Sequence, residues 1–167
     1  MAQKEELLVQ IKKAMQGEMD SVTLYANAAE HSDDPEVKEF FAGRREEELR
    51  HYYYLLRYHQ EIAQDKTLSE EALEVLALPE LHPIFSEDFV KRIGADQYLF
   101  SAISTALLLE KDAFEHYGKL AQMAGNLTLQ GFFALLEKWE MRHYDELLEI
   151  QKQAERHYWE ANSFEPF

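Results

Sequence analysis

The sequence contains no cysteine among its 167 residues. This absence excludes disulfides, zinc–thiolate sites, iron–sulfur clusters and a cysteine nucleophile, and it leaves the redox compartment open. The sequence also lacks an apolar run approaching the roughly 20 residues that span a bilayer, and its first residues lack the apolar core of a signal peptide. We therefore expect a cytoplasmic protein that has no membrane partner.

Basic residues are scarce. The 17 lysines and arginines are outnumbered by 32 aspartates and glutamates, which gives a formal net charge of -15 and a sequence pI near 4.8. This balance disfavours binding to nucleic acid and to anionic membranes, and it raises the local concentration of cations, which is a weak pointer towards metal ions. Most of the acidic side chains must form solvated surface, so acidity alone identifies no site.

Strand-like alternation is sustained nowhere, whereas helical periodicity covers four long stretches, approximately 4–31, 35–63, 95–124 and 127–158. An acidic turn with Pro35 at a first helical position separates the first two stretches. Gly125 and Asn126 form a helix stop between the last two. Because both turns are short, each pair of helices should be antiparallel, and the fold class should be all-α.

The segment 64–94 contains Pro79, Pro83 and Gly94, with a short helical piece expected from Ser69 to Leu76. A helix of 28 residues is about 42 Å long, and an extended chain covers at most about 3.6 Å per residue. The segment can therefore cross the length of a bundle. We predict one domain over residues 1–167, a four-helix bundle built from two helical hairpins joined by this long crossover. The aromatic tail, about 159–167, should fold back or cover a dimer contact.

The most informative pattern is a pair of Glu-x-x-His steps, Glu48/His51 and Glu140/His143. Each step lies 30 residues after another glutamate, and of the seven histidines only these two follow a glutamate at this spacing. The two sets are related by an offset of 92 residues, which also relates the pairs Tyr25/Tyr117, Phe41/Phe133, Arg50/Arg142 and Leu55/Leu147. The second helical hairpin therefore repeats the first.

The spacing of apolar residues along the helices predicts that these polar residues are buried. In the first helix a 3-4 rhythm runs through Leu8, Ile11, Met15, Glu18, Val22, Tyr25 and Ala29, and in the last it runs through Leu129, Phe133, Leu136, Glu140, His143, Leu147 and Ile150. Four carboxylates in one apolar layer would suffer desolvation and mutual repulsion, which protonation or bound cations must relieve. Two divalent ions would cancel the four charges.

The candidate ligands are Glu18, Glu48, His51, Glu110, Glu140 and His143. Carboxylate oxygen and imidazole nitrogen suit a pair of first-row ions, with iron the first choice and manganese the second, whereas the lack of thiolates argues against copper(I) and structural zinc. The alternative is that these residues are solvated helix positions, or a buried polar network that holds no metal.

On these residues the sequence resembles the ferritin-like superfamily, particularly its rubrerythrin-like and bacterioferritin-like di-iron proteins. The resemblance implies that Glu48 and Glu140 bridge two irons. It pairs Glu18 with His51 on one iron and Glu110 with His143 on the other. Tyr25 and Tyr117 match tyrosines that hydrogen-bond ligand carboxylates in this family, although ordinary core aromatics are the alternative.

The sequence departs from the family patterns in several places. It has Ala113 where rubrerythrins have an additional glutamate, and His143 where they have a glutamate. Without cysteine it cannot contain the rubredoxin domain of many rubrerythrins, so electrons must come from another protein or from substrate iron. Leu49 occupies the place of the haem methionine of bacterioferritins, and we expect no haem.

The resemblance implies a non-haem di-iron oxidoreductase that reduces hydrogen peroxide or dioxygen while oxidising Fe(II). We expect two iron ions per chain, an unidentified electron-donor protein and a homodimer. Two alternatives stay open, namely an iron-storage or iron-delivery protein and a metal-free structural bundle.

Overall fold

The structure is a computed structural model that describes residues 1–79 and 85–162. Its elements are helices α1 (Ala2–His31), α2 (Pro35–Ala63), α3 (Glu71–Leu76), α4 (Glu87–Ala95), α5 (Gln97–Met123) and α6 (Leu127–Ala161). The described part of the chain contains no strand. The prediction of an all-α, ferritin-like bundle is confirmed. None of these helices combines the length and the apolar composition needed to cross a membrane.

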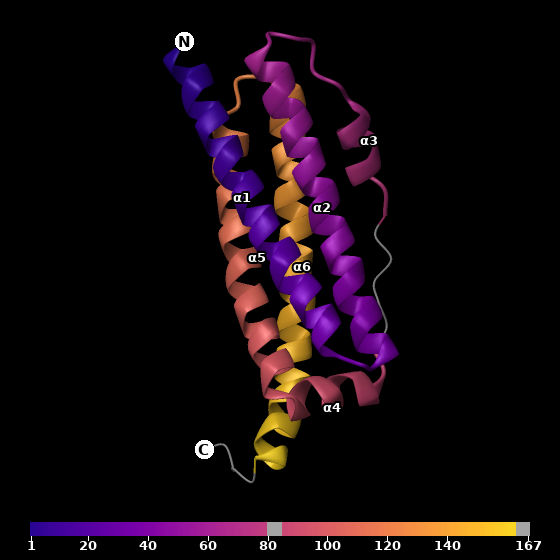
Figure 1. Cartoon of the computed structure of the whole chain (residues 1–167). Helices are drawn as coiled ribbons and strands as arrows, with labels where there is room; N and C mark the ends of the chain where they lie inside the picture. Colours follow the sequence, from indigo (N-terminus) through magenta and orange to yellow (C-terminus); the bar gives the residue numbers. More distant parts are fainter. Residues whose placement is uncertain (80–84, 163–167) are drawn as a thin grey trace.

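The four long helices form two antiparallel hairpins, α1 with α2 and α5 with α6, which pack together along their length (Figure 1). After α2 the chain returns past α3 to the opposite end of the bundle, where α4 lies across the helix ends (Figure 1). Helices α2 and α5 consequently run in the same direction, which is the arrangement that the long crossover predicted.

Side-chain caps start the second helix of each hairpin. The Asp34 carboxylate accepts a hydrogen bond from the Val37 amide at 3.0 Å, with Pro35 following at the first helical position. The Asn126 side chain accepts from the amides of Thr128 at 2.8 Å and Leu129 at 3.3 Å. Both caps supply acceptors for amides that have no partner within a helix, so the turn positions follow from local chemistry.

Helix α4 was not predicted, because its residues fell within the expected crossover 64–94. The Ser86 hydroxyl accepts from the Phe89 amide at 3.1 Å and starts the helix. Gly94, one of the residues that marked the expected crossover, lies inside α4 at a point where this helix approaches α6 closely. A Cβ atom at Gly94 would lie 2.4 Å from the Ala154 carbonyl oxygen.

Helix α6 continues to Ala161, so it includes the first residues of the expected tail. Residues 163–167, and residues 80–84 of the expected crossover, lie outside the described part of the chain.

The predicted apolar stripe of α1 is displaced at four positions. The structure buries Leu7, Ala14, Ser21 and Ala28, whereas Leu8, Met15, Val22 and Ala29 are only partly buried. Small side chains on the inner face let α1 approach its neighbours closely, and the larger apolar side chains lie on its flank. The positions of Ile11, Glu18 and Tyr25 are as predicted.

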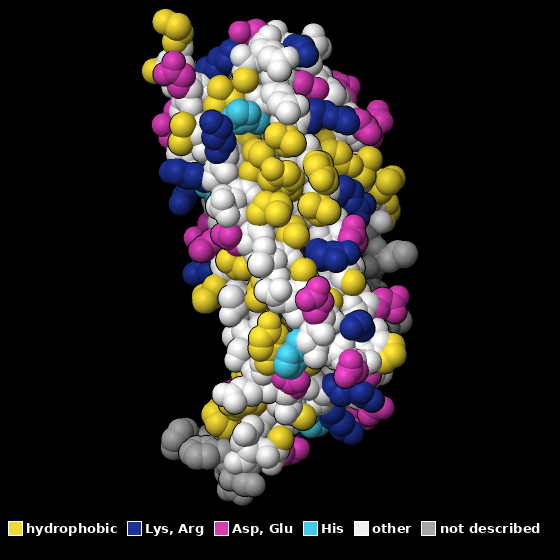
Figure 2. All heavy atoms as spheres, in the orientation of Figure 1, with side chains coloured by type: hydrophobic (Ala, Val, Ile, Leu, Met, Phe, Trp, Pro, Cys, Tyr) yellow, Lys and Arg dark blue, Asp and Glu magenta, His cyan; other side chains and the backbone are white. Residues whose placement is uncertain are grey.

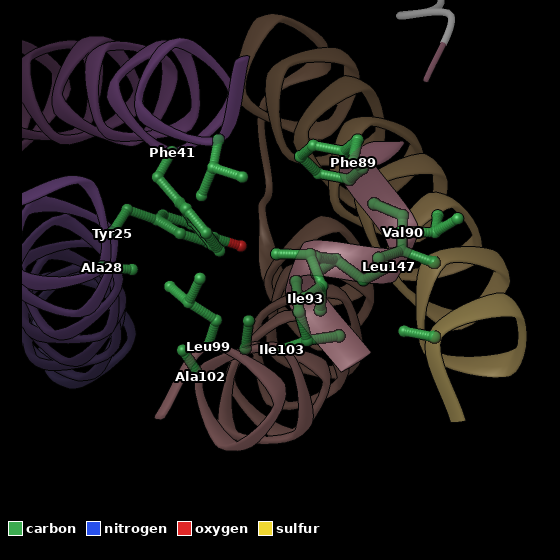
Figure 3. Close-up of a cluster of buried hydrophobic side chains, with 14 of the residues drawn as sticks. Tyr25, Ala28, Phe41, Phe89, Val90, Ile93, Leu99, Ala102, Ile103 and Leu147 are labelled. Carbon is green, nitrogen blue, oxygen red and sulfur yellow. The ribbon is translucent and has the colours of Figure 1, made fainter. Parts of the chain in front are cut away.

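Two apolar clusters fill the bundle. One contains Tyr25, Phe41 and the α4 residues Phe89, Val90 and Ile93, which close one end of the core (Figure 3). The other lies towards the opposite end and contains Leu7, Leu55, Tyr58, Leu120, Phe132 and Phe133. The six candidate ligand residues come from the helix segments between the two clusters.

Candidate metal centre

A buried polar layer crosses the middle of the bundle. Helix α1 supplies Glu18 and helix α5 supplies Glu110. The Glu-x-x-His steps of α2 and α6 each place two side chains on one helical face, because residues three apart are neighbours on a helix. All six predicted residues are between 0 and 2% exposed, namely Glu18, Glu48, His51, Glu110, Glu140 and His143.

The structure brings these six side chains together in two overlapping groups. Glu18 and His51 form one group with Glu48 and Glu140, and Glu110 and His143 form the other group with the same two glutamates. Within each group, one potential ligand atom per residue lies within 4.8 Å of the others. Each group could hold one ion, and the carboxylates of Glu48 and Glu140 belong to both groups.

Both histidines face the carboxylates through Nδ1. His143 Nδ1 lies 3.2 Å from Glu140 Oε2 and 3.3 Å from Glu48 Oε1. His51 Nδ1 lies 2.8 Å from Glu140 Oε1 and 3.8 Å from Glu18 Oε2. The two rings are nearly parallel, 16° apart, with centroids separated by 6.3 Å. Each group therefore has one imidazole nitrogen directed towards its oxygens.

The donor atoms fit metal ions better than they fit one another. Among the described residues, Glu18 Oε2, Glu48 Oε1, Glu140 Oε1 and His51 Nδ1 are buried without a hydrogen-bond partner. Although His51 Nδ1 and Glu140 Oε1 are close, they do not meet hydrogen-bond geometry. Leaving so many buried polar atoms unsatisfied costs free energy, and two cations would satisfy them. Oxygen and nitrogen donors without sulfur fit a non-haem site.

The electrostatics of the layer show the same need for cations. Burial and then the Glu140 carboxylate raise the pKa of Glu48 well above its usual range. Burial and then Glu110 raise the pKa of Glu140 to about 7. For His51 and His143, burial opposes the charged form, but the surrounding carboxylates outweigh it and raise both pKa values. Cations bound in this layer would compete with protons for Glu48, Glu140, His51 and His143.

Two tyrosines orient the outer glutamates across the bundle. The Tyr117 hydroxyl donates a hydrogen bond to Glu18 Oε1, and the Tyr25 hydroxyl donates one to Glu110 Oε1. Each phenol thus comes from the opposite hairpin, and both tyrosines are 1% exposed. The other oxygen of each glutamate, Oε2, lies 3.8 Å from Nδ1 of the histidine in the same group.

Glu47, which was not among the predicted site residues, lies beside the far side of His143. Glu47 Oε2 lies 3.1 Å from His143 Nε2 and 3.2 Å from Arg44 Nη1. Arg44 is 5% exposed and also pairs with Glu146 of α6. Although burial opposes it, contact with His143 and then Arg44 lowers the pKa of Glu47 to about 2. The signal in the sequence was Arg44, a charged residue within the apolar stripe of α2.

The two histidines differ in this outer contact. The residue 92 positions after Glu47 is Trp139, whose ring meets the His51 ring edge-on at a centroid distance of 6.0 Å. The Trp139 ring also meets the His143 ring edge-on, at a centroid distance of 6.1 Å, so the two histidines differ in the carboxylate of Glu47 beside His143. Outer carboxylates fix the tautomer and the orientation of metal-binding histidines, so the two halves of the layer are not equivalent.

Comparison with known proteins agrees with this geometry. The rubrerythrin family model matches residues 10–151, a span that covers most of the chain and contains all six residues of the buried layer. No curated protein and no solved structure gives a match. The extent of the family match leads to one conclusion: the chain belongs to the rubrerythrin family.

Proposed function

We propose that this protein is a non-haem di-iron oxidoreductase that reduces hydrogen peroxide or dioxygen while oxidising Fe(II). The observation that supports this proposal most strongly is the pair of four-residue ligand groups that share Glu48 and Glu140. This cluster lies within a chain of the rubrerythrin family. Carboxylate and imidazole donors favour iron, with manganese as the second choice.

The six residues of the layer would divide between two ions. Glu48 and Glu140 would bridge the ions. Glu18 with His51 would complete one position, and Glu110 with His143 would complete the other. Two bound ferrous ions would supply the two electrons that, with two protons, convert one hydrogen peroxide into two water molecules.

The protein environment contributes ligand geometry and limited access of water. Tyr25 and Tyr117 fix one oxygen of each outer glutamate. The apolar clusters on both sides of the layer lower the local dielectric and strengthen the electrostatic interactions of the ligands. Because the chain has no cysteine, the electrons would come from substrate Fe(II) or from a separate donor protein.

We further propose that the protein forms a homodimer through the face of α1 and α2. Figure 2 shows hydrophobic side chains gathered on this face, in the half that contains the start of α1. Leu8 and Met15 of α1 and Tyr52 and Leu56 of α2 are partly exposed. Contiguous exposed apolar surface favours association. Light scattering should give twice the chain mass of 19.7 kDa, whereas a closed cage of many subunits would favour iron storage.

An anaerobic Fe(II) titration followed by limiting oxidant tests the proposed activity. We expect saturation near two ions per chain, and then rapid oxidation by hydrogen peroxide or dioxygen, followed by near-ultraviolet absorption. Comparing the two oxidants at equal electron equivalents would identify the preferred one. Uptake of two ions without oxidation by either oxidant would contradict the activity but retain the metal site.

A further inference from the structure

A cavity between α1 and α5 leads from the surface to one half of the buried layer. Its volume is about 320 Å³, which gives room for several water-sized molecules. Glu18 and Tyr117, the hydrogen-bonded pair described above, form part of its lining. In Figure 1, α1 lies across α5 along this side of the bundle. One carboxylate therefore separates the cavity from the ion position of Glu18 and His51.

Small side chains keep this cavity open. A Cβ atom built on Gly17 would meet nothing within 4 Å. Ala14 and Ser21 of α1 and Ala113 of α5 contribute the remaining small groups of the wall. The repeat places Leu109 at the position equivalent to Gly17, and Leu109 is itself part of the lining.

The cavity is confined to one half of a layer that the repeat makes nearly symmetric. It is lined by Glu18 and Tyr117 but not by Glu110 and Tyr25, which are their counterparts in the repeat. The two halves also differ in a second respect, because His143 has the Glu47 carboxylate beside it. In the Glu110/His143 half, Glu47 lies beside the histidine, whereas in the other half Glu18 lines the cavity.

The mouth of the cavity carries charges of both signs. Lys13 and His116 lie among its lining residues together with Asp20 and Asp112. The His116 ring is held by the Gln10 carbonyl oxygen at 3.0 Å. Two aspartates beside one lysine, on a chain of net charge -15, disfavour anions, and the volume is small. An uncharged molecule of a few atoms fits both conditions.

We propose that this cavity admits the small uncharged oxidant to the ion held by Glu18 and His51, making that ion the one that binds the exogenous ligand. The inference rests on the proposed function and adds to it the route and the position of the substrate. Gly17 and Ala113 are then the residues that control access, and the pair Glu18/Tyr117 is the last layer before the ion.

The Gly17→Leu variant tests this route, with Gly43→Leu as the matched control. Gly43 is also a helical glycine with open space around its Cβ position, and it lies on an exposed part of α2. Both substitutions should improve helix propensity, so folding does not distinguish them. Each variant is first titrated anaerobically with Fe(II), and we expect uptake near two ions in both.

Two rates are then measured by stopped flow. One is the oxidation of the Fe(II)-loaded protein by hydrogen peroxide, and the other is the binding of nitric oxide, a small uncharged probe that reports access without turnover. In Gly17→Leu we expect both rates to fall at least tenfold, while Gly43→Leu keeps the wild-type rates. Ala113→Leu blocks the cavity from α5 and should reproduce the effect.

Wild-type rates in either cavity variant that retains two ions would overturn the proposed route and leave the proposed function intact. Loss of iron binding in both cavity variants would also overturn the proposed route. The residues that line the cavity would then serve to hold the ligands in place. A wild-type protein that binds no pair of ions would overturn the proposed function itself, and with it the route.

Discussion

The Glu47→Gln substitution probes the part of the centre that was least visible in the sequence. Glu47 Oε2 lies 3.1 Å from His143 Nε2. Glutamine keeps the size of the side chain but removes the negative charge beside the ring nitrogen. Arg44 retains its other partner, Glu146, so the exchange leaves that ion pair in place.

We expect the substitution to lower the binding affinity for one of the two ions. Loss of an outer carboxylate partner typically costs 10–100-fold in metal affinity, which corresponds to about 1.4–2.7 kcal/mol. Because Glu47 contacts His143 and not His51, the loss should fall on the ion bound by Glu110 and His143. Anaerobic Fe(II) titration, with total iron measured after equilibrium dialysis, would resolve the two binding steps.

Glu46→Gln is the matched control. Glu46 is a neighbouring glutamate whose side chain is 58% exposed and pairs with Arg45, so its substitution should leave both binding steps unchanged. If Glu47→Gln titrates like the wild type, or if it weakens both ions equally, the assigned role of Glu47 in positioning His143 is refuted.

Three further outcomes are expected. Glu48→Ala or Glu140→Ala should abolish paired-ion binding while circular dichroism retains the helical signal; unaltered two-ion uptake would refute their bridging role. Since burial and neighbouring carboxylates raise the pKa of Glu48, and that of Glu140 to about 7, ions must displace protons. Fe(II) affinity should therefore rise from pH 6 to pH 8 with calorimetric proton release, whereas a pH-independent affinity would contradict this. Gly94→Ala should lower the free energy of unfolding by about 1–3 kcal/mol, because its Cβ would lie 2.4 Å from the Ala154 oxygen; Gly43→Ala, which has open space, should not lower it in urea denaturation.

The long helices and the convergence of the six ligand candidates were predictable because both depend on local periodicity. A Glu-x-x-His step specifies one helical face, and the offset of 92 residues relates the two hairpins. Once Glu18 and Glu140 lie in the buried stripes of their helices, the bundle brings them together. The cross-bundle bonds of Tyr25 and Tyr117 occur at positions that the family resemblance indicated.

The features that were missed depend on contacts between distant segments. Helix α4 is short, and its Gly94 is explained only by the approach of α6. The inner face of α1 was misplaced at four positions because hydrophobicity identifies apolar residues without showing where close helix packing requires small ones. Glu47 looks like one more surface glutamate until α6 places His143 beside it. The α1–α5 cavity depends on two helices that are far apart in the sequence.

The most direct test of the central claim is a crystal structure of the Fe(II)-soaked protein with anomalous diffraction measured at the iron edge. The paired-site account predicts two peaks in the buried layer, both within bonding distance of Glu48 and Glu140, with His51 and His143 each on one ion. A single peak in the layer, or iron only at surface carboxylates, would contradict it.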